Sequence, residues 1–258
     1  MNKTLALILL SMTLPAPARA ALKTSEVDYK QGDTVLQGYF AWDDSYKGRR
    51  PGVLVVHEWW GHGPYARRRA EQLAGLGYLA FANDMYGKGK TAKTHEEAGA
   101  LSGPLRSDRK LMRERAMAAV EVLRKNPLAD PAHTAAIGYC FGGTTVLELA
   151  RMGADLKGVA SFHGGLDTPT PAEPGAVKAK VLVLQGAEDK WTMTGLPAFE
   201  DEMRAAKADW QVLTYGGAVH SFTVKEAGAD PSKGMAYDAA ADRRSWAALK
   251  DFLAEALK

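Results

Sequence analysis

The sequence has very little cysteine, since Cys140 is the only one among 258 residues. A single thiol excludes an internal disulfide, so a hydrophobic core has to stabilise the fold. With 46% hydrophobic and 24% charged residues, the chain is long and apolar enough to bury such a core. The lone thiol is then either buried and inert or exposed for a chemical purpose.

A strong charge imbalance, repeats and low-complexity segments are also absent. The formal net charge is +3, and basic and acidic residues are interspersed along the chain. Nucleic acids and anionic membranes are bound by clustered basic residues, so we expect neither as a partner. The stretch "TPTPAEPG" at 168–175 is typical of a surface loop rather than a linker. We therefore expect a single domain over residues 21–258, and a monomer.

The one long apolar run lies within the first twenty residues. A basic start at Lys3 precedes "TLALILLSMTL", and "APARA" ends the segment with small residues at Ala18 and Ala20. These features are typical of a secretory signal peptide, and the run is about half the ~20 residues that a membrane-spanning helix needs. We predict a signal peptide over 1–20, cleavage after Ala20, and a secreted or periplasmic protein without a stable membrane anchor. An uncleaved anchor or a ragged N-terminus is the alternative.

Short apolar runs alternate with helical patterns through the rest of the chain. The runs at 52–58, 77–84, 133–140, 156–165, 179–186 and 210–217 have the length and flanking of buried strands. Helices are predicted over 66–76, 107–124, 144–152, 196–206 and 237–257, and the alternation around Gly32 indicates an antiparallel hairpin. This order predicts an α/β fold with a mostly parallel sheet and helices on both faces. Ligands of such sheets bind beyond the carboxyl ends of the strands.

Cys140 lies at one of these strand ends, within "GYCFGG". Glycines at 138, 142 and 143 permit a tight turn from strand to helix, which is the form of a nucleophile elbow with cysteine in place of serine. The N-terminus of the following helix favours a thiolate, and the N–H of Phe141 is placed to donate to an oxyanion. On this motif alone, a nucleophile and a packed core cysteine are equally supported.

Two further strand ends supply partners for a nucleophile. "LQGAEDKW" contains Asp189 and "YGGAVHSF" contains His220, in the order nucleophile, acid, histidine that α/β-hydrolases have. We predict His220 as general base and then acid, with Asp189 orienting its ring and stabilising the imidazolium. Glu188 is the rival acid, and a hydrogen-bonded surface histidine is the alternative for His220.

The stretch "VHEWWGHGPY" follows an early core strand, where these folds obtain a second oxyanion N–H. We predict the amide of Trp59 as this donor and expect Glu58 close to the thiol, where it competes with His220 for the thiol's proton or orients it. His57, Glu58 and His62 also suggest a metal site. However, the two histidines are five residues apart and lie on either side of a strand end. We therefore expect no metal, and a structural role for His57.

Together, "VHEWWG", "GYCFGG", "GAEDKW", "VHSF" and "AYDAAADRRSWAALKDFL" resemble the dienelactone hydrolase family of α/β-hydrolases, from about Val27 to the C-terminus. The resemblance implies a triad of Cys140, Asp189 and His220, with Glu58 as the glutamate that modulates the thiol. It also implies hydrolysis of a small carboxylic ester or lactone through a thioester, without a metal or an organic cofactor.

Candidates for the substrate pocket lie near the predicted strand ends: Trp60, Tyr86, Lys88, His163 and Trp191. The aromatic residues are equally well explained by core packing. Family members specific for dienelactone carry an arginine after the "D-x-Y" strand end, where this chain has "NDMYGKGK". Lys88 or Lys90 lacks the planar fork of an arginine, so the substrate stays open. A non-catalytic small-molecule binding protein on this scaffold is the alternative to an enzyme.

Overall fold

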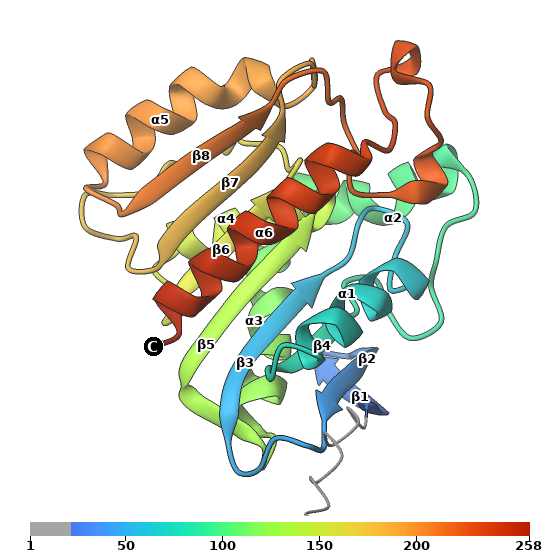
Figure 1. Ribbon diagram of the computed structural model, residues 1–258, viewed down its shortest axis with the longest axis vertical. Helices are drawn as coiled ribbons and strands as arrows, with labels where there is room; N and C mark the ends of the chain where they lie inside the picture. The colour runs from blue at the N-terminus through green and yellow to red at the C-terminus, as the bar shows by residue number, and fades with distance from the viewer. Residues whose placement is uncertain (1–21) are drawn as a thin grey trace, which may run out of the picture.

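The computed structural model describes residues 22–258, so the predicted signal peptide lies outside the described residues. Eight strands form one sheet in the order β1-β2-β4-β3-β5-β6-β7-β8 (Figure 1). The pairs β1–β2 and β2–β4 are antiparallel, and all other neighbours are parallel. The strands are β1 (Leu22–Gln31), β2 (Thr34–Asp43), β3 (Arg50–Val56), β4 (Leu79–Asn83), β5 (Ala129–Tyr139), β6 (Gly158–Phe162), β7 (Lys180–Gly186) and β8 (Trp210–Tyr215).

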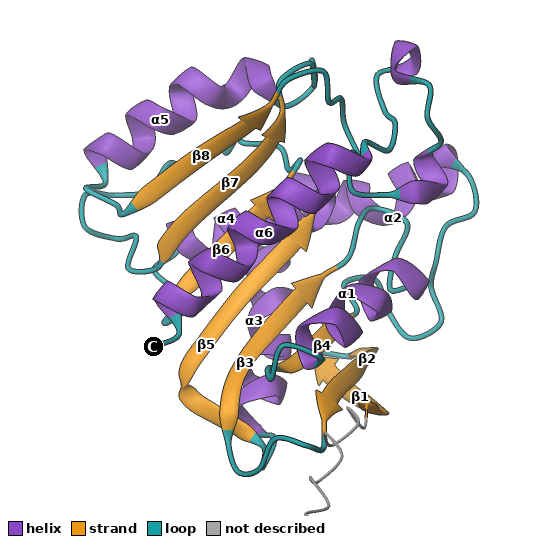
Figure 2. Ribbon diagram, in the orientation of Figure 1, coloured by secondary structure: helices purple, strands orange, loops and turns teal. Residues whose placement is uncertain are grey.

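Helices cover both faces of this sheet (Figure 2). On one face lie α1 (Pro64–Ala74) and α6 (Ala239–Ala256), and on the other α2 (His95–Ser107), α3 (Arg109–Lys125), α4 (Phe141–Arg151) and α5 (Leu196–Ala205). In β3, Val53 and Val55 pack toward the first face, whereas Leu54 and Val56 pack toward the second. Burial on both faces explains why the strand is continuously apolar, and the predicted α/β fold is confirmed. Within residues 22–258, no helix is long and apolar enough to span a membrane.

The predicted elements are present with shifted ends, and one helix was missed. The hairpin of β1 and β2 turns at Gly32, whose φ of 55° suits glycine. The run predicted over 156–165 ends as a strand at Phe162, because His163 has a φ of 39°. The missed helix is α2, which contains two glycines and Pro104. These residues disfavour a helix interior, so packing rather than propensity maintains it.

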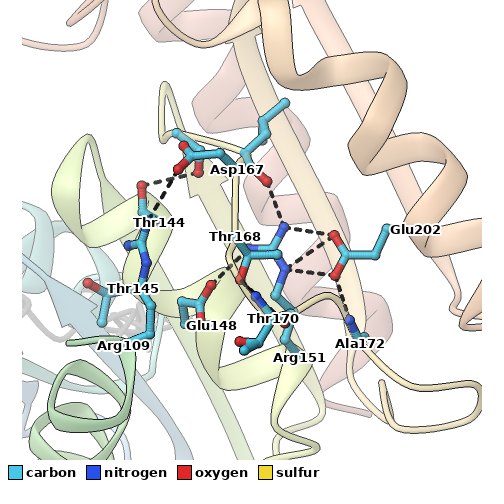
Figure 3. Close-up of polar contacts among 12 residues, drawn as sticks. Arg109, Thr144, Thr145, Glu148, Arg151, Asp167, Thr168, Thr170, Ala172 and Glu202 are labelled. Carbon is cyan, nitrogen blue, oxygen red and sulfur yellow. Dashed lines mark hydrogen bonds and ion pairs between the residues drawn. The ribbon is translucent and has the colours of Figure 1, made fainter. Parts of the chain in front are cut away.

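A buried network of ion pairs fixes the far end of α4 (Figure 3). The Arg151 guanidinium lies 2.8 Å from the Glu202 carboxylate and 3.2 Å from that of Glu148, and it donates to the Leu166 carbonyl at 2.6 Å. Glu148 is fully buried and is also paired with Arg113 at 2.6 Å. Because every buried charge has an opposite partner, the cost of burial is offset. The helix that begins immediately after Cys140 is thus firmly anchored.

Candidate active site

Cys140 occupies a strained turn between β5 and α4. Its φ of 52° and ψ of −113° are unusual for a residue with a side chain and cost about 1–3 kcal/mol. A Cβ on Gly138 would lie 2.0 Å from the Gly142 carbonyl oxygen, and one on Gly142 would lie 2.2 Å from that of Val56. The flanking glycines therefore allow the turn to pack directly on the end of β3. The Cys140 N–H donates to the Phe162 carbonyl at 2.9 Å, which fixes the turn against β6.

His220 connects Cys140 to Asp189. His220 Nδ1 lies 2.7 Å from Asp189 Oδ2, and the imidazole interacts electrostatically with the Cys140 side chain. Burial alone would lower the pKa of His220, but the charge on Cys140 and the bond to Asp189 outweigh it and raise the pKa to about 10. This favours an imidazolium at His220. Asp189 is fully buried, whereas the rival acid Glu188 is exposed.

Glu58 lies at the end of β3 and is only 5% exposed. Burial raises the pKa of its carboxyl to about 7, against the opposing effect of the His220 charge. Within residues 22–258, the structure gives this carboxyl no hydrogen-bond partner. Glu58 is therefore a largely buried acid that interacts with the candidate base through its charge.

The Trp59 and Phe141 amides are the two predicted oxyanion donors. Phe141 is the first residue of α4, and Trp59 lies just beyond the end of β3, which the turn at Gly142 contacts. In the described part of the chain, neither N–H has a protein acceptor. Tyr86 supports this loop, because its hydroxyl donates to the Trp59 carbonyl at 3.0 Å. Both N–H groups are thus available to a bound oxygen atom.

His57 holds the same loop by its two ring nitrogens. Nδ1 donates to the Glu58 carbonyl, and Nε2 accepts from the Met85 N–H at 3.1 Å. Burial lowers the pKa of His57, in keeping with a neutral ring in this role. Within residues 22–258, no three His, Cys, Asp or Glu side chains are grouped so that they could hold a metal ion.

A cavity of about 340 Å³, here called the Cys140 cavity, lies over Cys140 and His220. Trp191 is one of its walls, and the Trp191 ring meets the His220 ring edge-on with centroids 5.4 Å apart. Its other lining residues are Trp59, His95, Arg106, Gly165, Thr192, Ser221 and Met235. The apolar walls and the few polar groups suit a small organic substrate.

Only some of the predicted pocket residues line a cavity in the structure. Trp191 lines the Cys140 cavity, and Trp60 lines an adjoining one. Tyr86, Lys88 and His163 are not among the lining residues of either cavity. Tyr86 is turned inward to support the Trp59 loop, and the Lys88 side chain forms a surface ion pair with Asp28.

His163 packs behind His220 rather than toward substrate. The two ring centroids are 5.1 Å apart, and His163 is fully buried. Burial lowers the pKa of His163 well below its usual value, so the ring is neutral and does not repel an imidazolium at His220. His163 Nε2 lies 2.8 Å from Thr223 Oγ1, which in turn lies 2.6 Å from the Tyr65 hydroxyl. This chain of hydrogen bonds ties the His220 loop to β6 and α1.

Arg106 is the functional candidate that the sequence did not reveal. It lies in the last turn of α2, lines the Cys140 cavity, and has its guanidinium 5.5 Å from the centre of the Phe141 ring. The signal that would have found α2 is a capping pattern, since Thr94 Oγ1 accepts from the N–H of Glu97 three residues later. Arg106 provides the cation that neither Lys88 nor Lys90 brings to this cavity.

A strained turn after β5, followed by an acid after β7 and a histidine after β8, is the arrangement of an α/β-hydrolase. This chain belongs to the dienelactone hydrolase family, whose model matches residues 36–257.

Two solved structures and one further protein are similar to this chain. A solved structure named m3DLH is 40% identical, with a TM-score of 0.87, and the match covers 92% of this chain and 100% of that one. The dienelactone hydrolase-like promiscuous phosphotriesterase P91 from metagenomic libraries is 41% identical, with a TM-score of 0.83 and the same coverage of 92% and 100%. The uncharacterized protein K02A2.1 of Caenorhabditis elegans is 37% identical over 149 residues, which is 56% of this chain and 94% of that protein.

Proposed function

We propose that this chain is an exported hydrolase that cleaves a carboxylic ester or lactone through a thioester on Cys140. The observation that carries the proposal is the continuous set of contacts from Cys140 to His220 to Asp189 beneath one cavity. Membership of the dienelactone hydrolase family supports a hydrolase. Export, to the periplasm or out of the cell, is supported by the signal-peptide pattern of residues 1–20.

In the proposed reaction, Cys140 Sγ attacks the ester carbonyl carbon. The new C–S bond moves the carbonyl π electrons onto oxygen, where the N–H groups of Trp59 and Phe141 donate to the oxyanion. Collapse of this intermediate breaks the C–O bond, and His220 gives its proton to the departing oxygen. Water then attacks the thioester with His220 as base, which releases the acid and restores the thiolate. Asp189 holds Nδ1 of His220 throughout.

Glu58 adjusts the proton balance of this pair. Its pKa of about 7 means that its charge changes near neutral pH, and its charge acts on His220. A charged Glu58 favours the imidazolium, and a protonated one weakens that preference. We propose this as the way in which the strand-end glutamate modulates the thiol.

The position of Arg106 indicates which class of substrate the cavity favours. A guanidinium in the cavity that holds Cys140 favours an acyl part with a carboxylate or another anionic group. The cation comes from α2 rather than from the "D-x-Y" strand end.

The test is the Cys140→Ala variant of the chain from residue 21 onward, assayed with 4-nitrophenyl acetate. We expect hydrolysis to fall to the rate of the buffer, since the nucleophile is gone, with an unchanged far-UV circular dichroism spectrum. Turnover equal to that of the wild type would overturn the proposal, and a wild type no faster than the buffer would favour a binding protein on a hydrolase scaffold.

A further inference from the structure

A second cavity, of about 650 Å³, adjoins the Cys140 cavity. The two share His95, Ser221 and Met235 as lining residues, so they form neighbouring compartments of one larger space. The second is lined by Glu58 and not by Cys140, and we call it the Glu58 cavity. The proposed bond-making and bond-breaking steps take place in the Cys140 cavity and leave the Glu58 cavity without a role.

The Glu58 carboxyl is the feature that points to a ligand in this cavity. It is 5% exposed, it lines the cavity, and within residues 22–258 no side chain or backbone group forms a hydrogen bond with it. A ligand in the cavity that donates a hydrogen bond to this carboxyl supplies the partner that the protein does not. A hydroxyl group is the simplest such donor.

The remaining walls define the body of the ligand. Trp60, Tyr65, Val224 and Met235 provide apolar surface. The charges at the rim largely cancel, because Arg68 is paired with Glu226 at 2.8 Å. Apart from Arg68, Lys233 is the one Lys or Arg among the described lining residues. An uncharged apolar body therefore fits better than a strongly charged one.

The proposed function indicates which part of the substrate occupies the Glu58 cavity. In the thioester the acyl group is bonded to Cys140 Sγ, so it has to lie in the cavity that Cys140 lines. The leaving oxygen receives its proton from His220, and Ser221, the next residue, lines both cavities. The released part of the substrate therefore departs on the side of the Glu58 cavity.

We propose that the Glu58 cavity is the alcohol subsite, and that the preferred substrates are esters of apolar alcohols that carry a second hydroxyl for Glu58. This inference rests on the proposed function and names the leaving-group class for the same site. It predicts that lengthening the alcohol raises kcat/KM, and that a terminal hydroxyl raises it further.

The first experiment blocks the cavity. Ala227 lines the Glu58 cavity and lies in a half-buried surface turn, so Ala227→Trp fills the space without entering the Cys140 cavity. Acetate release from ethyl acetate and hexyl acetate is measured with the chain from residue 21 onward. We expect the ratio of kcat/KM for hexyl over ethyl acetate to fall about tenfold, mainly through KM. Ala229→Trp, on the same loop but lining neither cavity, is the matched control and should keep the wild-type ratio.

The second experiment tests the hydroxyl. In the wild type, 6-hydroxyhexyl acetate should exceed hexyl acetate in kcat/KM by about tenfold, as expected for one hydrogen bond to a charged group. Glu58→Met keeps the length of the side chain but removes the acceptor. Because both substrates are compared within one variant, any change in the chemical step cancels, and the preference should disappear.

The outcomes separate this proposal from the proposed function. If Cys140→Ala abolishes turnover but Ala227→Trp changes both acetates equally, the chemistry stands and the alcohol subsite is wrong. An equal preference for the hydroxyl in wild type and Glu58→Met also overturns the subsite. If Cys140→Ala keeps its turnover, the proposed function itself fails.

Discussion

Cys140 and His220 meet in one cavity, but the chain brings them there by different means. Cys140 lies between β5 and α4, and backbone contacts of its glycine neighbours with β3 fix the turn. His220 lies five residues beyond β8, in a segment whose only helical parts are the short η2 (Lys225–Ala227) and η3 (Pro231–Lys233) (Figure 1). The candidate nucleophile is thus positioned by close backbone packing, and the candidate base by a loop.

Hydrogen bonds hold that loop in place. The His220 N–H donates to the Gly234 carbonyl at 3.2 Å, and the Ala236 N–H donates to the His220 carbonyl at 3.1 Å. Thr223 bonds His163 and Tyr65, and the Arg69 guanidinium donates to the Thr223 carbonyl at 3.1 Å. The two residues should therefore respond differently to substitution. The glycines beside Cys140 leave no room for an added side-chain atom, whereas the position of His220 can be shifted gradually by removing single hydrogen bonds from its loop.

The largest effect is expected at the glycine turn. Gly142→Ala places a Cβ 2.2 Å from the Val56 carbonyl oxygen and 2.7 Å from that of His57, where backbone cannot give way cheaply. We expect a loss of more than about 4 kcal/mol in the free energy of unfolding, together with loss of esterase activity. Urea denaturation and the 4-nitrophenyl acetate assay measure both.

The control for this variant is Gly99→Ala in α2. A Cβ on Gly99 has no atom within 4 Å, so the same substitution should be neutral or stabilise the helix by about 0.5–1 kcal/mol. A Gly142→Ala protein as stable and active as the wild type would show that the turn is not held by close packing.

A smaller, pH-dependent effect is expected at Glu58, beside the candidate base. Its pKa rises from 4.5 to about 7 on folding, so between these values the folded state keeps a proton that the unfolded chain releases. Stability from this group is therefore present at low pH and is lost as pH rises through about 7, by about 3 kcal/mol in total. Glu58→Gln removes this loss, so the variant should be more stable than the wild type at pH 8.

Urea denaturation at pH 5 and pH 8 checks this prediction. The advantage of Glu58→Gln should be small at pH 5 and close to its full size at pH 8. Glu188→Gln, at an exposed position next to Asp189, is the control and should show no such trend. If the free energy of unfolding changed with pH in the same way for wild type and Glu58→Gln, the raised pKa of Glu58 would be contradicted.

The smallest effect is expected in the hydrogen bonds of the loop. Thr223→Val removes the hydroxyl between His163 and Tyr65, and we expect a loss of about 1–3 kcal/mol in stability. Since the loop carries His220, kcat should also fall about tenfold, and the pH dependence of kcat should shift. Thr145→Val is the counterpart on the nucleophile side, because its hydroxyl donates to the Phe141 carbonyl within α4. An equal fall in kcat for both variants would contradict the distinction between the Cys140 turn and the His220 loop.

Much of the fold was predictable because the parallel strands are buried on both faces and read as continuous apolar runs. The positions of Cys140, Asp189 and His220 followed from the same runs, since each residue comes just after a strand. The glycines beside Cys140 signalled the turn, in which Cys140 has a strained backbone conformation. Local sequence therefore sufficed to bring these three residues to one edge of the sheet.

The parts that were not predictable depend on which way a side chain turns. Tyr86 and His163 follow strand ends as Asp189 does, yet both point into the protein. Lys88 was expected near substrate, but its nearest opposite charge is Asp28 on the hairpin. Arg106 lies on a helix with poor propensity, and only its tertiary packing brings it to the cavity. Such orientations come from contacts between segments distant in sequence.

The central claim is that Cys140 carries the acyl group during the reaction. Its most direct measurement is mass spectrometry of the protein quenched with acid during turnover of 4-nitrophenyl acetate. The account predicts that the wild type gains the mass of one acetyl group, located by peptide mapping on Cys140, and that Cys140→Ala gains none. An acetyl group on another residue, or turnover without any acyl protein when hydrolysis of the thioester is slowed at low pH, would contradict it.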